Sequence, residues 1–263
     1  MRSFMFAWAA LIIVAGLACA EGGVKKRKPL PYEFGSVVIG NFSQSAGLSP
    51  VIFDHWLHRS KYTCRVCHVD IGFGMTAGST KIRAADNRKG YYCGACHNGK
   101  SRFDKKTIFE ACSGEDSKKC GICHFTGRNP LREQDFYKFA EKMPKERFGN
   151  GINWEQAEGK GLINPIDQLE GISIPRNALA VQKDFSLPVK TEGMPEIIFS
   201  HKKHTIWNGC ELCHPDIFLG VKKGATKYSM VELFQGKYCG VCHDKVAFPQ
   251  TDCQRCHAGS LQK

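Results

Sequence analysis

Residues 53–68 read FDHWLHRSKYTCRVCH, and residues 199–214 read FSHKKHTIWNGCELCH. Each stretch joins a Phe-x-His-x-x-His sequence to a Cys-x-x-Cys-His sequence, and the two copies lie 146 residues apart. Twelve of the fourteen cysteines in this 263-residue chain fall in six Cys-x-x-Cys-His sequences. A disulfide framework has more irregular spacing. The chain is therefore organised around a repeated site.

The six sites form two groups of three. The first group is Cys64, Cys67 and His68; Cys93, Cys96 and His97; and Cys120, Cys123 and His124. The second group is Cys210, Cys213 and His214; Cys239, Cys242 and His243; and Cys253, Cys256 and His257. The shift of 146 residues holds for the first two sites and drops to 133 for the third, so the first half has thirteen extra residues, which we place around residues 107–119. A repeat of this size predicts two similar structural units with three sites each.

The spacing within each site fits covalent attachment of haem. Two cysteines three positions apart are about one helical turn apart, so both sulfurs reach the vinyl groups at one edge of a haem, and the next residue brings its imidazole to the iron. Zinc sites and redox-active dithiols also use Cys-x-x-Cys. Six copies, each followed by His, favour haem. We therefore expect six covalently bound haem c groups, which also fill the interior of a chain with few ordinary core residues.

Four histidines lie outside the six sites: His55, His58, His201 and His204. They stand as two His-x-x-His pairs, nine and six residues before the first cysteine of each half. A single histidine beside apolar residues is more often a packed core residue than a ligand. The paired positions in register favour axial ligands, on the face of each iron opposite the site histidine. Two imidazoles saturate the iron and keep similar geometry in both oxidation states, which suits an electron carrier.

Each half resembles a trihaem unit of the cytochrome c7/c3 family, over about residues 50–124 and 196–257, and the tandem resembles the multihaem cytochromes exported by metal-respiring anaerobic bacteria. The resemblance implies a mostly irregular fold with short α-helices, in which two trihaem units pack around their haems. It also implies that the first His of each Phe-x-His-x-x-His sequence serves the first haem and that the second His serves the second haem. The implied ligand pairs are His55 with His68, His58 with His97, His201 with His214, and His204 with His243.

The third haem of each half departs from the family pattern. Small members of the family supply its distal histidine from four residues before the second Cys-x-x-Cys-His site, where this chain has Lys89 and Gln235. Methionine is the natural substitute because His/Met ligation is common. Met75 and Met230 lie in the corresponding loops and are candidate ligands, although core packing explains them equally well. Lys89 and the unpaired Cys112 are further alternatives.

The first twenty residues are typical of an export signal. Arg2 is followed by an apolar run that is too short to span a membrane, and then by the small-residue triplet Ala18-Cys19-Ala20. Lipidation of Cys19 and an uncleaved anchor are the alternatives. We expect an exported protein in the periplasm or at the outer cell surface, and not an integral membrane protein after signal cleavage.

The chain between the two groups of sites has no Cys or His. Asn129-Pro130 is typical of a helix start, apolar residues of the following segment share one face, and Gly149 is a stop signal. The remainder reads as extended chain packed on the units. The predicted organisation is a signal peptide over 1–20, an extended N-terminal segment over 21–49, a first trihaem unit over 50–127, a connector over 128–195 with one helix at about 130–147, and a second trihaem unit over 196–263.

The chain carries a formal net charge of +12. Such a charge suggests nucleic acid or an acidic partner, but each haem brings two propionates, so six haems offset it. We therefore expect an electron carrier, not an enzyme, that exchanges electrons with other cytochromes or with quinol-linked or outer-membrane complexes, ending at an acceptor such as an extracellular metal, and that binds no nucleic acid. Two alternatives are a multihaem reductase with an open haem at His124 or His257, and a structural subunit of an electron conduit.

Overall fold

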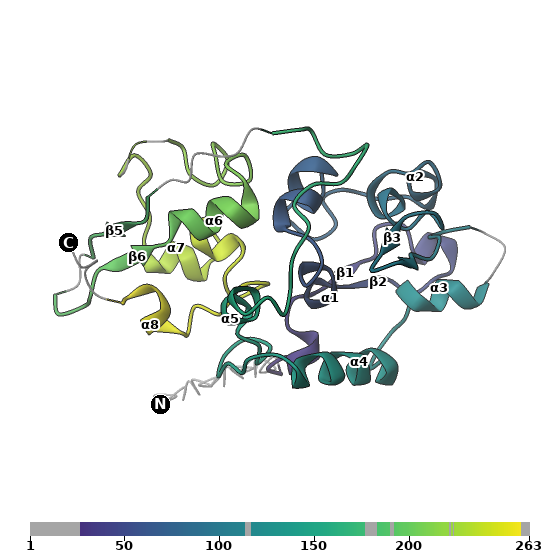
Figure 1. The fold of residues 1–263 in the computed structure, drawn as a ribbon, viewed down its shortest axis with the longest axis horizontal. Coiled ribbons are helices and arrows are strands. Elements are labelled where there is room, and N and C mark those ends of the chain that lie inside the picture. Colours follow the sequence, from purple (N-terminus) through teal and green to yellow (C-terminus); the bar gives the residue numbers. More distant parts are fainter. Residues whose placement is uncertain are drawn as a thin grey trace, which may run out of the picture.

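The computed structural model of the chain describes residues 27–113, 117–176, 183–189, 192–220, 222 and 224–258. The expected export signal and Cys19 lie outside the described residues. Short helices joined by irregular chain make up most of the molecule, as predicted, and they form two lobes (Figure 1). The strands of the described part pair in three two-stranded sheets.

The helices and strands are short. The α-helices are α1 His55–Arg59, α2 Ala84–Arg88, α3 Ser117–Cys123, α4 Pro130–Glu141, α5 Trp154–Gly159, α6 His201–Asn208, α7 Met230–Phe234 and α8 Cys253–Cys256. The strands are β1 Ser36–Ile39, β2 Val51–Asp54, β3 Arg102–Phe103, β4 Lys106–Thr107, β5 Phe185–Leu187 and β6 Ile197–Phe199. Turns of 3-10 helix cover Pro31–Glu33, Gln44–Ala46, Tyr92–Ala95 and Tyr238–Val241, and a π-helical turn covers Val66–Asp70.

The same strand-to-helix junction begins each trihaem unit. In the first unit β2 ends at Asp54 and α1 begins at His55, and in the second unit β6 ends at Phe199 and α6 begins at His201. Each strand has an antiparallel partner, β1 for β2 and β5 for β6. The segment 21–49 was predicted to be an extended N-terminal segment. Its part Ser36–Ile39 is a strand that pairs with β2 of the first unit.

The described residues of the connector contain two helices where one was predicted. The start of α4 is as expected, because the Asn129 side chain accepts a hydrogen bond from the Arg132 N–H and Pro130 occupies the first turn. α4 ends at Glu141, earlier than predicted, and Pro144 follows. α5 is capped by Asn153, whose side chain accepts from the Gln156 N–H. Its six residues are too few to show a helical repeat in the sequence.

Residues of the connector form a cluster of buried side chains with residues of the first unit and the N-terminal segment. It comprises Tyr32, Trp56, Phe136, Ala140, Met143, Ile152, Ala157 and Ile163, with Phe139, Trp154 and Trp207 packed against it. The predicted apolar face of α4 thus lies in this cluster. The Trp56 ring of the first unit meets the Phe136 ring edge-on at 5.2 Å. Trp207 comes from α6 of the second unit, so the connector packs against both units, and α5 lies between the two lobes (Figure 1).

Polar side chains also join the two units. Arg176 of the connector forms ion pairs with Asp70, just after the first site, at 2.8 Å, and with Glu211, inside the fourth site, at 3.1 Å. A Cβ at Gly209, whose φ is +68°, would lie 2.7 Å from Glu211 and 2.8 Å from Arg65 of the first site. Glycine is favoured there because of its positive φ, and the side chains of Arg65 and Glu211 both approach its backbone. The first and fourth sites therefore lie close together.

No helix in the described part of the chain is both long enough and apolar enough to cross a membrane.

Candidate haem-binding sites

Each Cys-x-x-Cys-His site forms a tight helical turn. In five of the sites the His N–H donates to the carbonyl of the first Cys at 2.8–3.0 Å, and the first site lies in the helical turns that include Val66–Asp70. This turn brings the two sulfurs and the imidazole of one site close together. Burial raises the pKa of Cys67 and Cys93 to about 12. A redox-active dithiol needs the opposite, a thiolate stabilised near neutral pH, so the thiol environment disfavours that alternative.

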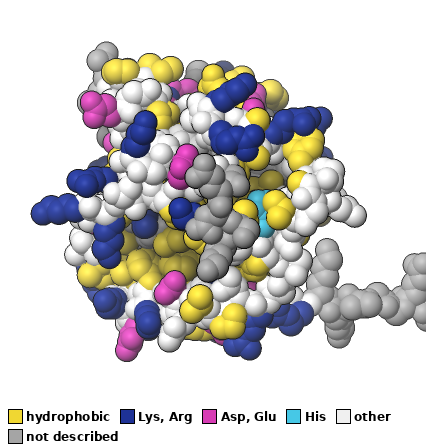
Figure 2. Space-filling model, turned by 90° about the vertical axis from the view of Figure 1, so that its right-hand side faces the viewer, with side chains coloured by type: hydrophobic (Ala, Val, Ile, Leu, Met, Phe, Trp, Pro, Cys, Tyr) yellow, Lys and Arg dark blue, Asp and Glu magenta, His cyan; other side chains and the backbone are white. Residues whose placement is uncertain are grey.

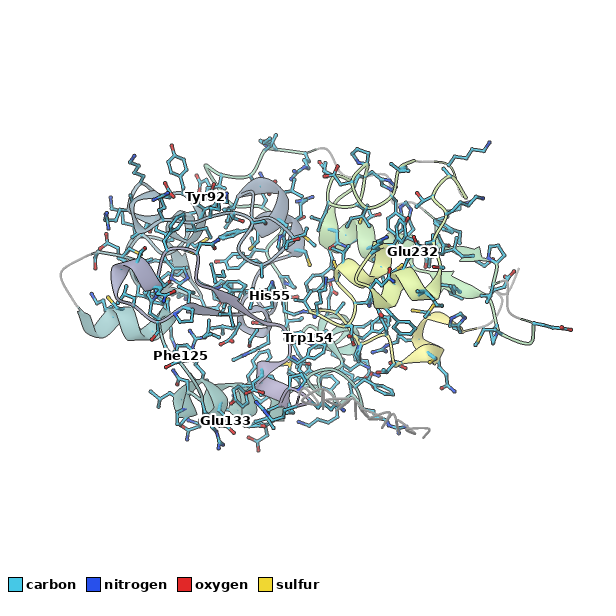
Figure 3. All side chains as sticks on the ribbon, turned by 180° about the vertical axis from the view of Figure 1, so that it is seen from behind. His55, Tyr92, Phe125, Glu133, Trp154 and Glu232 are labelled. Carbon is cyan, nitrogen blue, oxygen red and sulfur yellow. The ribbon has the colours of Figure 1, made fainter. Side chains whose placement is uncertain are left out.

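Three of the four implied ligand pairs bring their imidazole rings together across a gap of similar width. The ring centroids are 6.4 Å apart for His55 and His68, 6.3 Å for His58 and His97, and 6.2 Å for His204 and His243. Imidazole nitrogens bind a metal ion at about 2 Å. Two rings bound on opposite sides of one ion therefore have their centroids about 6 Å apart. The three gaps fit one haem iron each, and His55 lies in the interior near the middle of the molecule (Figure 3).

The fourth pair is less tightly defined. His201 begins α6 and its ring lies 5.7 Å from the rings of both Phe185 and Phe199. Burial lowers the pKa of His201, and the neighbouring His214 contributes to this shift. His201 and His214 are therefore electrostatic neighbours, as the repeat requires.

Backbone carbonyls orient most of these imidazoles. In eight histidines the ring Nδ1–H donates to a backbone carbonyl at 2.7–3.1 Å. The pairs of histidine and carbonyl residue are His55–Gly35, His58–Asp54, His68–Phe73, His124–Ser49, His204–Ser200, His214–Phe218, His243–Phe248 and His257–Pro195. Metal-binding histidines use this arrangement because it fixes the tautomer and leaves Nε2 for the metal. This supports the fit of the site histidines to haem iron.

The distal histidines are held in the neutral form. Burial is the main cause that lowers the pKa of His55 and His58 to about 4. The carbonyl that accepts from each Nδ1–H opposes this shift without cancelling it. At neutral pH the free nitrogen of each ring therefore carries a lone pair, which is the form that binds iron.

The second site of each unit is repeated in detail. The Phe53 ring lies 4.3 Å from the His58 ring, and the Phe199 ring lies 4.5 Å from the His204 ring. Gly94 and Gly240 pack against backbone carbonyls so closely that any Cβ there would clash. The internal repeat seen in the cysteines therefore extends to the packing around the ligands.

The extra residues of the first unit lie in two places. The His97 ring contacts Phe109 at 4.5 Å, and the His243 ring contacts Phe248 at 4.3 Å, so these two phenylalanines are equivalent. Eleven residues separate His97 from Phe109, whereas four separate His243 from Phe248. More than half of the insertion thus precedes Phe109, where it forms the β3–β4 hairpin, and not in 107–119 as expected from the sequence.

The third site of each unit keeps the repeat for its proximal histidine. His124 donates to Ser49 O and His257 donates to Pro195 O, and these two carbonyls are 146 residues apart. Met75 is half-buried in the loop after the first site, and Met230 is 42% exposed at the start of α7. The sixth ligand of these two sites therefore stays a prediction.

The surface of the first unit also suits haem. At this end of the molecule, hydrophobic side chains gather in a hollow and Lys and Arg side chains stand around it (Figure 2). An apolar recess with a basic rim matches a group that has an apolar macrocycle and two propionates.

Two features near the sites were not found from the sequence. Asp54 is buried at the start of α1, accepts from Ser36 Oγ–H at 2.7 Å and pairs with Arg132 of the connector at 2.6 Å. Arg59 at the end of α1 reaches the second unit, where it donates to Val246 O at 2.9 Å. Neither is repeated in the other half, where Ser200 and Thr205 stand, so the duplication gave no signal for them.

The family model described as cytochrome c7 and related cytochrome c matches residues 51–125 and 197–258, which is more than half of the chain. No curated protein matches the sequence.

Three solved structures resemble the chain. The C-terminal hexaheme fragment of GSU1996 is 25% identical and the match covers 88% of this chain and 99% of that one, with a TM-score of 0.26. The N-terminal hexaheme fragment of GSU1996 is 24% identical over 86% and 99%, with a TM-score of 0.24. The dodecaheme cytochrome c GSU1996 is 23% identical over 86% and 75%, with a TM-score of 0.26.

The family match covers both groups of sites, and the expected cytochrome c7-like fold of short helices and few short strands is present. The chain belongs to the family of cytochrome c7 and related cytochromes c.

Proposed function

We propose that this chain is an exported hexahaem cytochrome that passes electrons along its haems to another redox protein in anaerobic respiration, with an extracellular metal as the final acceptor. Bound haem supplies an iron that takes up and releases one electron at a time. The twelve site cysteines would attach the six haems, and the site histidines would bind the irons. The observation that carries the proposal is the gap of 6.2–6.4 Å between three pairs of imidazole rings.

The residues at the junction support a path between the two units. Arg176 pairs with Asp70, just after the first site, and with Glu211, inside the fourth site. Arg59 donates to Val246 O beside the fifth site. Sites so close across the junction would allow electrons to move between units without leaving the protein.

The paired imidazoles favour electron transfer over catalysis at their sites. A pair of histidines excludes water and other small molecules from the iron and holds the same geometry before and after electron transfer. This supports a carrier rather than an enzyme for the sites on His68, His97, His214 and His243. We infer partners among cytochromes and quinol-linked or outer-membrane electron-transfer complexes, with the chain located in the periplasm or at the cell surface.

The test is a haem count on protein from a host that matures c-type cytochromes. We expect a mass that exceeds the polypeptide by six haems and a reduced spectrum dominated by low-spin haem. A colourless protein, or a mass equal to that of the polypeptide alone, would refute the proposal. Fractionation of the native host would test the location independently.

The third sites favour a second candidate. The four distal histidines are assigned to the other four sites, which leaves no histidine as a second ligand for the sites on His124 and His257. The second candidate is therefore a reductase with an open haem on His124 or His257. Carbon monoxide added to the reduced protein distinguishes the two. An unchanged spectrum supports the carrier, and a shift in up to two of the six haems supports the reductase.

A further inference from the structure

The junction between the units contains a positive charge held between two aromatic rings. The guanidinium carbon of Arg59 lies 4.4 Å from the ring centroid of Trp154 and 5.5 Å from that of Trp207. Trp154 belongs to the connector and Trp207 to the second unit, and Trp154 lies between the two lobes (Figure 3). Aromatic faces hold an arginine in place while keeping its charge. Arg59 is therefore fixed at the junction.

Arg59 is near ligands of both units. Its guanidinium donates to Val246 O, in the loop between His243 and the Phe248 carbonyl that orients it. On the other side, a Cβ at Gly35 would lie 3.6 Å from the Cβ of His55 and 3.7 Å from Val246 Cα. The loop that supports His243 thus packs beside the backbone that supports His55.

Arg59 is placed beside ligands of both units. It follows His55 by about one helical turn in α1, and its guanidinium donates to the loop that supports His243. The carboxylate that acts on Arg59 through space is Glu158, which accepts from the Trp207 indole N–H at 2.8 Å. Among the residues that the structure describes, Arg59 forms no ion pair with a carboxylate, so its charge is not cancelled locally.

We propose that Arg59 is a positioning residue for electron transfer between the units, whose charge raises the reduction potentials of the sites on His68 and His243 together. The inference rests on the proposed function. A fixed positive charge favours the form of a site that holds the extra electron, because that form is less positive. Arg59 lies beside both sites, so it raises both potentials, and an equal effect on the two leaves their difference unchanged. One electron that leaves the first site reduces the second by one.

The experiment compares a variant that removes the positive charge of Arg59 with one that keeps it. Arg59→Gln is compared with Arg59→Lys in the haem-loaded protein, and the potential of each haem is followed by NMR during a redox titration. We expect Arg59→Gln to weaken electron binding at the sites on His68 and His243 by about tenfold, which is about 59 mV for a one-electron couple. Arg59→Lys keeps the charge and should stay near the wild-type potentials.

Two further variants keep the test decisive. Lys61→Gln removes a positive charge two residues after Arg59. The Lys61 ammonium lies over the Phe103 ring, and its charge acts on His97. Lys61→Gln should lower the potential of the site on His97 and leave the two junction sites unchanged. Glu158→Gln removes the nearby acid, and we expect it to raise both junction potentials.

The inference would be overturned if each junction site had the same potential in the wild type, Arg59→Gln and Glu158→Gln while six haems remained bound. A shift confined to one junction site in Arg59→Gln would overturn the shared role. A protein without haem would instead overturn the proposed function itself, so the two failures are distinguishable.

Discussion

The imidazole planes of His55 and His68 are nearly parallel, 5° apart, with their centroids 6.4 Å from one another. The planes of His58 and His97 are 55° apart, and those of His204 and His243 are 50° apart. The relative orientation of two axial imidazoles sets the splitting of the iron d orbitals. The first site and the second sites of the two units therefore have different ligand fields.

Electron paramagnetic resonance of the oxidised protein should show this difference. We expect a rhombic low-spin signal from the site on His68 and more anisotropic low-spin signals from the sites on His97 and His243. His55→Met should remove the rhombic signal, and His58→Met should remove one of the anisotropic signals. A spectrum in which both variants lose the same signal would contradict the geometry.

Removal of a distal ligand should open one haem. In His58→Gly the iron on His97 loses its second imidazole, so one haem of six should become high-spin and bind carbon monoxide when reduced. His204→Gly should do the same for the site on His243. The matched control is Leu57→Ala, an exposed neighbour in α1 that should leave the spin states as in the wild type. More carbon monoxide binding by the control than by the wild type, or no added binding by His58→Gly, would count against the assigned ligand pairs.

Acid should destabilise the protein through its buried histidines. Burial lowers the pKa of His58 to about 4 from the ordinary value of 6.5, so the unfolded chain binds more protons between these values. The stabilisation is fully present above pH 6.5 and is lost as the pH falls through about 4. We expect the free energy of unfolding in denaturant to decrease from pH 7 to pH 4, and less steeply in His58→Met. Equal slopes in the two proteins would refute this role of His58.

The aromatic cluster under the connector should carry much of the stability. Phe136 is 1% exposed and contacts Trp56, so Phe136→Ala should cost about 3–5 kcal/mol in the free energy of unfolding. Leu131 lies on the same helix and is 72% exposed, so Leu131→Ala should change the free energy of unfolding little. Similar losses in both variants, measured by denaturant titration of the haem-loaded protein, would show that α4 is not packed as described.

The ion pairs of Arg176 should hold the two units together. Asp70 has a fully buried carboxylate, and Arg176→Ala would leave this charge without its 2.8 Å partner, at a cost of about 3–5 kcal/mol. We expect faster proteolysis within the connector and an expanded shape in small-angle X-ray scattering. The control is Arg128→Ala, which removes an exposed ion pair to Glu133 and should cost less than about 1 kcal/mol. Unchanged scattering and proteolysis in Arg176→Ala would contradict this role.

The sequence was sufficient for features that depend on local spacing. A Cys-x-x-Cys-His site closes within one helical turn, so its residues can be recognised without knowledge of the fold. The capped start of α4 at Asn129 was also predicted, because an N-cap depends on residues three positions apart. The pairing of His58 with His97 came from the family resemblance, and the ring geometry agrees with it. The sixth ligand of the sites on His124 and His257 could not be identified from the sequence, because neither Met75 nor Met230 repeats between the halves.

The sequence by itself determined the six sites, the four spare histidines and the duplication, since all of these are patterns along the chain. The tertiary structure alone decided that β1 joins the first unit, that the insertion is split around Phe109, and that Arg59 meets Trp154, Trp207 and Val246. Arg59 and Val246 are 187 positions apart, and no periodicity links them. Contacts of this kind arise from the packing of the connector between two units, which the order of residues specifies only through the folded chain.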